Sequence, residues 1–141
     1  MTTTRTYDIA LLQLMGLFER VTHAKVKDVM YFKEMPTFIV EEGELMRALG
    51  PRNMNVERLE KMLGKRVKIV EFRANVVDFV RNLLIPYRTV SINQEGSVIL
   101  IEGQDTKTNG LIIGAHAQNL RAYEGIVQRY FPEITELKVI S

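Results

Sequence analysis

The chain has 141 residues and a formal net charge of +2, with 46% hydrophobic and 26% charged residues. This balance is typical of a small folded protein and excludes a disordered chain and a large multidomain enzyme. The absence of cysteine excludes disulfides and thiolate chemistry, and the two histidines, His23 and His116, are too far apart in sequence to suggest a metal site. No apolar run of about 18 residues and no signal-peptide pattern is present, which predicts a cytoplasmic protein without membrane contact.

Basic residues are concentrated in the first half of the chain. Residues 1–74 contain 13 basic and 10 acidic residues, whereas residues 75–141 contain 6 and 7. The stretch from Arg52 to Lys68 contains six basic residues and only two acidic ones. Because nucleic-acid binding depends on a local basic patch more than on total charge, this stretch is a candidate binding surface.

The first half is predicted to begin with a helix and a hairpin. Apolar residues recur at helical spacing between Leu11 and Val21, and β-branched and aromatic residues mark the two strands that follow. Gly50-Pro51 then separates a short helix from a longer one, since glycine ends helices well and proline cannot continue them. The expected elements are a helix at 6–23, strands at 29–32 and 37–40, a short helix at 44–49, a helix from about 55 to Gly64, and a strand at 67–70.

The second half is predicted to repeat this order. Its first helix shows apolar residues at i, i+3, i+4 and i+7 and ends before Pro86. The expected elements are a helix at 76–84, strands at 89–92 and 97–101, a short helix at 107–113, a long helix closed by Pro132, and a strand at 137–140. The glycine turns at Gly50 and Gly114 align at an offset of 64 residues, which indicates an internal duplication.

The αββααβ order, with an aliphatic-Gly-x-x turn between two helices, resembles the type II KH module. The residues that carry the likeness are Leu49-Gly50 with the stretch Val56–Val67, and residues 111–114 with Asn119-Leu120. Two such modules without a linker resemble the small archaeal NusA-like transcription factors. The resemblance implies an α+β fold of two tandem αββααβ modules packed together, at residues 5–74 and 75–141, and no enzymatic activity.

In KH modules the turn reads Gly-x-x-Gly, because its backbone presses against nucleic-acid phosphates and a side chain would obstruct them. The start of the next helix adds N–H donors and a positive dipole end. The resemblance therefore implies RNA contacts in both turns, at the following helix starts and along the basic stretch. The candidate residues are Gly50, Pro51, Arg52, Asn53, Asn55, Arg58, Lys61, Lys65, Arg66, Gly114, Ala115, His116, Ala117, Asn119 and Arg121.

Both turns depart from the family pattern at their last position, where Asn53 and Ala117 replace the closing glycine. Asparagine tolerates a left-handed backbone better than alanine does, so the second turn departs further. Arg52 places a positive charge where a phosphate would lie, whereas His116 is neutral near pH 7. We therefore expect the first turn to dominate any RNA binding.

Other interpretations of these residues stay open at this point. The two glycines can be plain helix caps, His116 a surface residue, and the basic stretch a solvated helix face with pairs such as Glu57–Lys61. The tyrosines and methionines are interpreted as core residues, and the acidic group at Glu41, Glu42 and Glu44 as a helix N-terminal cluster. The tyrosines are Tyr7, Tyr31, Tyr87, Tyr123 and Tyr130.

The function implied by the resemblance is binding of single-stranded RNA in transcription termination or elongation control, with the nascent transcript and RNA polymerase as partners. No cofactor, metal or small-molecule substrate is expected. The alternative is a protein-interaction scaffold on RNA polymerase or the ribosome, in which the altered turns no longer bind RNA.

Overall fold

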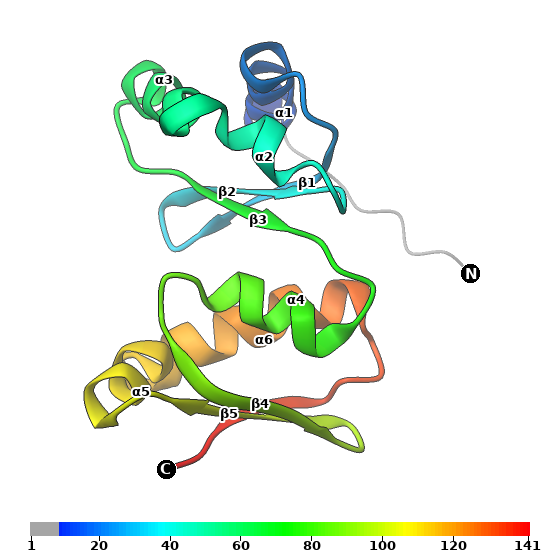
Figure 1. The fold of residues 1–141 in the computed structure, drawn as a ribbon, viewed down its shortest axis with the longest axis vertical. Coiled ribbons are helices and arrows are strands. Elements are labelled where there is room, and N and C mark those ends of the chain that lie inside the picture. Colours follow the sequence, from blue (N-terminus) through cyan, green and yellow to red (C-terminus); the bar gives the residue numbers. More distant parts are fainter. Residues whose placement is uncertain (1–8) are drawn as a thin grey trace. The chain divides into compact units, whose positions relative to one another are not determined.

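The structure is a computed structural model that describes residues 9–141, and the described chain divides after Phe72 into two compact units. Each unit has the same order of elements, namely a helix, two strands, a short helix, a one-turn 3-10 segment, a longer helix and a strand. In each unit the helices lie against one face of that unit's own three-stranded sheet (Figure 1). The expected α+β class and the repeated order of elements are confirmed.

The first unit follows the predicted order closely. The part of the first helix expected before Ile9 lies outside the described residues, as does Tyr7. The elements are α1 (Ile9–Thr22), β1 (Val26–Phe32), β2 (Met35–Val40), α2 (Leu45–Leu49), η1 (Pro51–Asn53), α3 (Met54–Leu63) and β3 (Lys68–Glu71).

The second unit repeats the first, and its hairpin strands are longer than predicted. The predicted strands ended too early because the polar residues Asn93, Gln94 and Glu95 continue β4 on an exposed edge. The elements are α4 (Val76–Leu84), β4 (Thr89–Glu95), β5 (Val98–Gly103), α5 (Thr106–Ile113), η2 (Ala115–Ala117), α6 (Gln118–Tyr130) and β6 (Glu136–Val139).

The two sheets have the same topology, with the hairpin strands antiparallel and the third strand parallel to the second. The parallel pairing follows from the two helices between those strands, which carry the chain back to the starting edge. The hairpins also share a register, since Phe32 pairs with Met35 and Glu95 with Val98 immediately before each turn. Positions in the two units can therefore be matched residue by residue.

Aromatic and aliphatic side chains form a separate core cluster between the helices and the sheet of each unit. In the first, Phe18 of α1 stacks on Phe38 of β2 with ring centroids 4.4 Å apart. In the second, Phe79 of α4 contacts the rings of Tyr130 and Phe131 at 5.6 and 5.9 Å. Burial of large side chains of this kind is the main stabilising term in a small domain.

A glutamate on the longer helix holds the last strand of each unit. The Val67 N–H donates to Oε2 of Glu60 at 3.0 Å, and the Leu137 N–H donates to Oε2 of Glu124 at 2.9 Å. Hydrogen bonds from backbone N–H groups to a carboxylate are stronger than neutral ones. The bond therefore fixes where the chain leaves α3 or α6, and it positions the residues that follow each helix.

Some sequence-based interpretations of single side chains were wrong. Tyr31 was placed in the core but is 46% exposed, because it lies on the open side of the hairpin end. Three methionines are exposed rather than buried, since they lie on the outer faces of α2 and α3: Met46, Met54 and Met62. By contrast, the acidic group does precede a helix as predicted: Glu44 is the N-cap residue of α2, and its carboxylate accepts the Lys25 N–H at 2.8 Å.

Candidate nucleic-acid interface

The two glycine turns have the same backbone conformation. Gly50 has φ 74° and ψ 170°, and Gly114 has φ 75° and ψ 173°. Each glycine donates its N–H to a carbonyl of the preceding helix, at Met46 and Gly110 respectively. Both glycines therefore do end a helix, although in an extended positive-φ region open almost only to glycine and not in the left-handed helical one.

Two consecutive left-handed residues complete each turn. Arg52 and Asn53 have φ 54° and 59°, and His116 and Ala117 have φ 55° and 60°. The closing position of both turns is thus left-handed, a conformation that asparagine tolerates better than alanine, and the residue before it is left-handed as well. Alanine lacks the local side-chain hydrogen bond that helps asparagine in this region, so Ala117 holds backbone strain of about 1–2 kcal/mol.

An asparagine side chain ties each turn to the helix before it. Nδ2 of Asn55 donates to the Arg47 carbonyl at 3.1 Å, and Nδ2 of Asn119 donates to the Leu111 carbonyl at the same distance. Both bonds span eight residues of chain and close the turn from the inside. Asn55 and Asn119, predicted as RNA contacts, thus have a structural role within the turn.

The helices that follow the turns begin without a side-chain cap. Asn53 precedes α3 and Ala117 precedes α6, and neither supplies a capping hydrogen bond. By contrast, Asn75 caps α4 through the Asp78 N–H. An uncapped helix start leaves backbone N–H donors for an outside acceptor, and an anion such as a phosphate is favoured there.

The predicted basic contacts of the first unit are exposed and carry no ion pair within residues 9–141. They lie in the turn, on α3 and in the loop after α3: Arg52, Arg58, Lys61, Lys65 and Arg66. Over the same described range no pair joins Glu57 to Lys61, so the i,i+4 pair considered for this helix face is not formed. Unpaired cations in a row are available to the phosphates of a nucleic acid.

The matching surface of the second unit is different in charge. Nη1 of Arg121, the one predicted basic contact there, lies 3.0 Å from Oε2 of Glu124, and Nη2 donates to the Leu137 carbonyl at 3.0 Å. The turn itself consists of Ala115, His116 and Ala117 after Gly114. The structure therefore repeats the shape of the first turn without its free positive charges.

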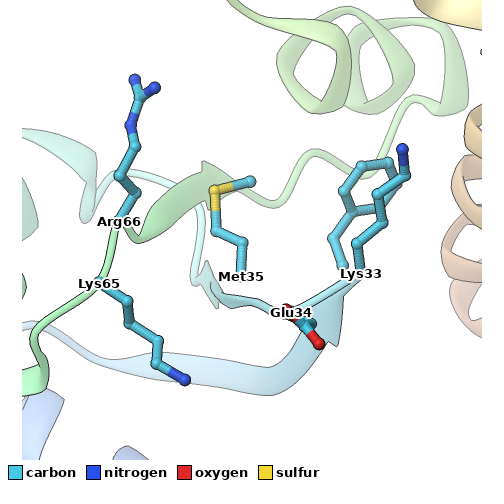
Figure 2. A pocket seen from close by; sticks show the side chains of 6 residues that line it. Lys33, Glu34, Met35, Lys65 and Arg66 are labelled. Atoms are coloured by element: carbon cyan, nitrogen blue, oxygen red, sulfur yellow. The ribbon is translucent and has the colours of Figure 1, made fainter.

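Sequence reasoning missed the end of the β1–β2 hairpin, which lies beside the loop after α3. A hollow of about 470 Å³ opens there between Phe32–Met35 and the pair Lys65 and Arg66 (Figure 2). Nearby, Nζ of Lys68 lies 5.9 Å from the centre of the Phe32 ring, and burial lowers the pKa of this lysine to about 8. The basic residues after Gly64 were a signal of this site in the sequence. Only the paired register of the hairpin, however, places Tyr31 and Lys33 beside them.

The described residues contain no long apolar helix able to cross a membrane. Between Ile9 and Ser141, no three side chains of the metal-binding types lie close enough together to hold a metal ion.

Curated proteins from archaea are similar to this chain over most of its length. The probable transcription termination protein NusA of Halococcus morrhuae is 31% identical over 122 residues, which cover 85% of this chain and 88% of that protein. The probable transcription termination protein NusA of Methanocaldococcus jannaschii is 30% identical over 128 residues, which cover 89% of this chain and 69% of that protein. No protein-family model matches the chain.

A solved structure shares the fold. The crystal structure of APE1850 superposes with a TM-score of 0.70 and 22% sequence identity, covering 95% of this chain and 100% of that one. At this identity the likeness concerns the fold alone.

Proposed function

The chain belongs to the archaeal NusA-like family of transcription termination proteins, and on this premise we propose that it binds single-stranded RNA in the control of transcription termination or elongation. The nascent transcript is the proposed ligand, and RNA polymerase is the proposed protein partner. We further propose that each unit is a type II KH module, which the αββααβ order and the glycine turn between two helices support.

The observation that carries the proposal is the first turn. Gly50 brings the backbone to the surface without a side chain, and α3 begins uncapped directly after it. Arg52 adds an exposed guanidinium with no ion pair in the described chain. Together these features offer a phosphate group backbone donors, a helix dipole and a charged side chain at one place.

The basic residues of α3 extend this site. Arg58 and Lys61 are three positions apart, and Lys65 follows four positions later, so the first two share a helix face that leads toward the third. We propose that the phosphate backbone follows this face, while unstacked bases lie on the apolar surface beside the turn. Exposed Met46 and Met54 on either side of the turn supply such a surface.

The second turn is proposed to contribute less. It repeats the backbone geometry, but its histidine is the only polar side chain among the three residues after Gly114, and Arg121 is held by Glu124. This turn has no arginine or lysine, which is the observation that favours the rival function, a protein-docking scaffold. Under that function neither turn needs to contact RNA.

A titration of single-stranded RNA with charge-reversed variants tests the proposal. Lys61→Glu should weaken binding of a fluorescent ten-nucleotide RNA across different sequences and flatten its salt dependence, since a phosphate contact and its released counterions are lost. Arg81→Glu is the matched control, because it makes the same change in net charge in the second unit, where Arg81 pairs with Asp78 at 2.9 Å. Equal effects of both variants would mean that only total charge matters, and no binding by the unaltered protein would favour the scaffold.

A further inference from the structure

The end of the β1–β2 hairpin exposes an aromatic ring among cations. Tyr31 is 46% exposed and borders a second hollow, also of about 470 Å³, together with Lys33, Glu34 and Lys65. On the adjoining side, Lys65 and Arg66 leave the loop after α3 in different directions, with Met35 between that loop and the hairpin (Figure 2). An exposed ring with nearby cations has the composition of a stacking site for a nucleic-acid base.

The charges at this end are free and mostly positive. Lys33, Lys65 and Arg66 face a single acid, Glu34, and none of the four forms an ion pair with any residue in 9–141. The surface therefore has an excess of positive charge that no carboxylate within residues 9–141 neutralises. A ligand that complements it must be anionic and must also offer a flat apolar face to the ring.

The second unit provides an internal comparison, because the two hairpins share a register. Phe32 and Glu95 occupy the last paired position before each turn, so Tyr31 of the first unit matches Gln94 of the second. In the loop after α6, Glu133 stands where the first unit has two basic residues after its helix. The aromatic ring and the positive charge are thus both confined to the unit that also has the charged turn.

The hairpin end lies beyond the far end of α3 from the Gly50 turn. With ten residues, α3 separates the two by roughly 15 Å. A KH-type turn clamps four nucleotides, and the ring lies at the opposite end of α3 from that turn. Arg58 and Lys61 carry exposed positive charge over the intervening length.

We propose that this hollow, bordered by Tyr31, Lys33 and Lys65, receives a base of the same single-stranded RNA outside the four nucleotides at the turn. The base stacks on the Tyr31 ring, and the neighbouring phosphate lies between the two lysine side chains. This inference rests on the proposed RNA binding and extends it to a longer footprint on the first unit. An acidic surface of a partner protein is the competing occupant, and the test separates the two.

The test compares RNAs of four and ten nucleotides. Binding of the ten-nucleotide RNA is measured by fluorescence anisotropy, and binding of the tetranucleotide by NMR shifts of the amides around Gly50. Tyr31→Ala should weaken binding of the longer RNA about five-fold or more, the usual effect of losing one stacked base, and leave the affinity for the tetranucleotide unchanged. Tyr31→Phe should bind as the unaltered protein does, and Glu34→Gln should bind the longer RNA more tightly because it removes the only acid at the hollow.

Two controls keep the outcome decisive. Gln94→Ala, the matched position in the second unit, should not change either affinity, and an unchanged tetranucleotide affinity shows that Tyr31→Ala is folded. If Arg52→Ala weakens binding of the longer RNA while Tyr31→Ala does not, the hollow is not an RNA site. A partner protein is then the favoured occupant of the hollow. If no variant and no RNA length gives measurable binding, the RNA function itself fails, and this inference with it.

Discussion

Nδ2 of Asn55 lies 2.8 Å from the position that a Cβ atom on Gly50 would occupy, and the same amide donates to the Arg47 carbonyl at 3.1 Å. In the second unit the matching distance, from Asn119 to a Cβ on Gly114, is 2.7 Å. The absence of a side chain at each glycine therefore lets the asparagine close the turn. The glycines are required by the fold, whether or not a phosphate also rests on them.

Gly50→Ala should destabilise the protein by roughly 2–4 kcal/mol, because it adds a methyl group against Asn55 and forces alanine to φ 74° and ψ 170°. Gly64→Ala is the matched control, since Gly64 has φ 68° and ψ 25° with no atom within 4 Å of the added methyl. It should cost only about 1 kcal/mol. Chemical denaturation measures both, and an equal loss in the two variants would contradict the role given to Asn55.

Two substitutions to glycine in the second turn should have opposite effects on stability. Ala117→Gly relieves a left-handed alanine and should stabilise the protein by up to about 1 kcal/mol. Ala115, two residues earlier, has negative φ, so Ala115→Gly only frees the unfolded chain and should destabilise it by about 0.5–1 kcal/mol. Thermal unfolding of the pair gives the answer, and a loss of stability from Ala117→Gly would speak against the assigned strain. The same variant should bind RNA more tightly, because it removes a methyl group where a phosphate would approach.

The two turns should contribute unequally to RNA binding. Arg52→Ala removes an exposed charged donor and should weaken RNA binding about five-fold, on the order of 1 kcal/mol after solvent screening. His116→Ala should have a smaller effect, and His116→Arg should strengthen binding by giving the second turn the charge of the first. Anisotropy titrations at one fixed salt concentration compare the three, and a larger loss from His116→Ala would reverse the assignment.

Lys68 should make stability depend on pH in the alkaline range. Burial lowers its pKa in the folded protein to about 8, from 10.5. Between these values the unfolded chain binds more protons, so stability rises with pH, by up to roughly 3 kcal/mol. The Lys68→Met variant should lack this rise. Below pH 8 it should be more stable than the unaltered protein, and this difference in the free energy of unfolding should shrink as the pH approaches 10.5.

Urea unfolding of both proteins from pH 7 to pH 10.5 tests this difference. Burial, with a smaller effect of Tyr87, raises the pKa of Tyr123 to about 12, so the folded protein keeps that proton longer and loses stability above pH 10. Because Tyr123 is present in both proteins, its effect cancels in the comparison. A constant difference across the range would show that Lys68 is not desolvated.

Much of this architecture could be predicted from the sequence, because its strands and helices follow strong local patterns. Apolar spacing located α4 and α6, and the Gly50 and Gly114 turns revealed the repeat. The exposure of Tyr31 could not be predicted, since an aromatic residue in a strand looks the same on a buried and an open face.

Contacts between residues distant in the sequence could not be predicted either. The basic stretch was visible, but its freedom from ion pairs in the described chain depends on where each side chain points. Asn55 was assigned to RNA, and its bond to a carbonyl eight residues earlier was not predicted. Arg121 was assigned in the same way, and its bond to the Leu137 carbonyl, 16 residues later, was not predicted. Long-range partners of this kind follow from tertiary packing, which local patterns do not encode.

The salt dependence of single-stranded RNA affinity is the most direct test of the central claim that the first unit holds the phosphate backbone. For the unaltered protein, log affinity should fall linearly with log salt concentration. Each phosphate contact should contribute about −0.7 to the slope, so several contacts give a steep fall. Removing Arg52, Arg58 and Lys61 together should flatten that slope by about two, while removing Arg81, Arg88 and Arg129 from the second unit should leave it nearly unchanged. Equal slopes for the two triple variants, or a slope near zero for the unaltered protein, would contradict the claim.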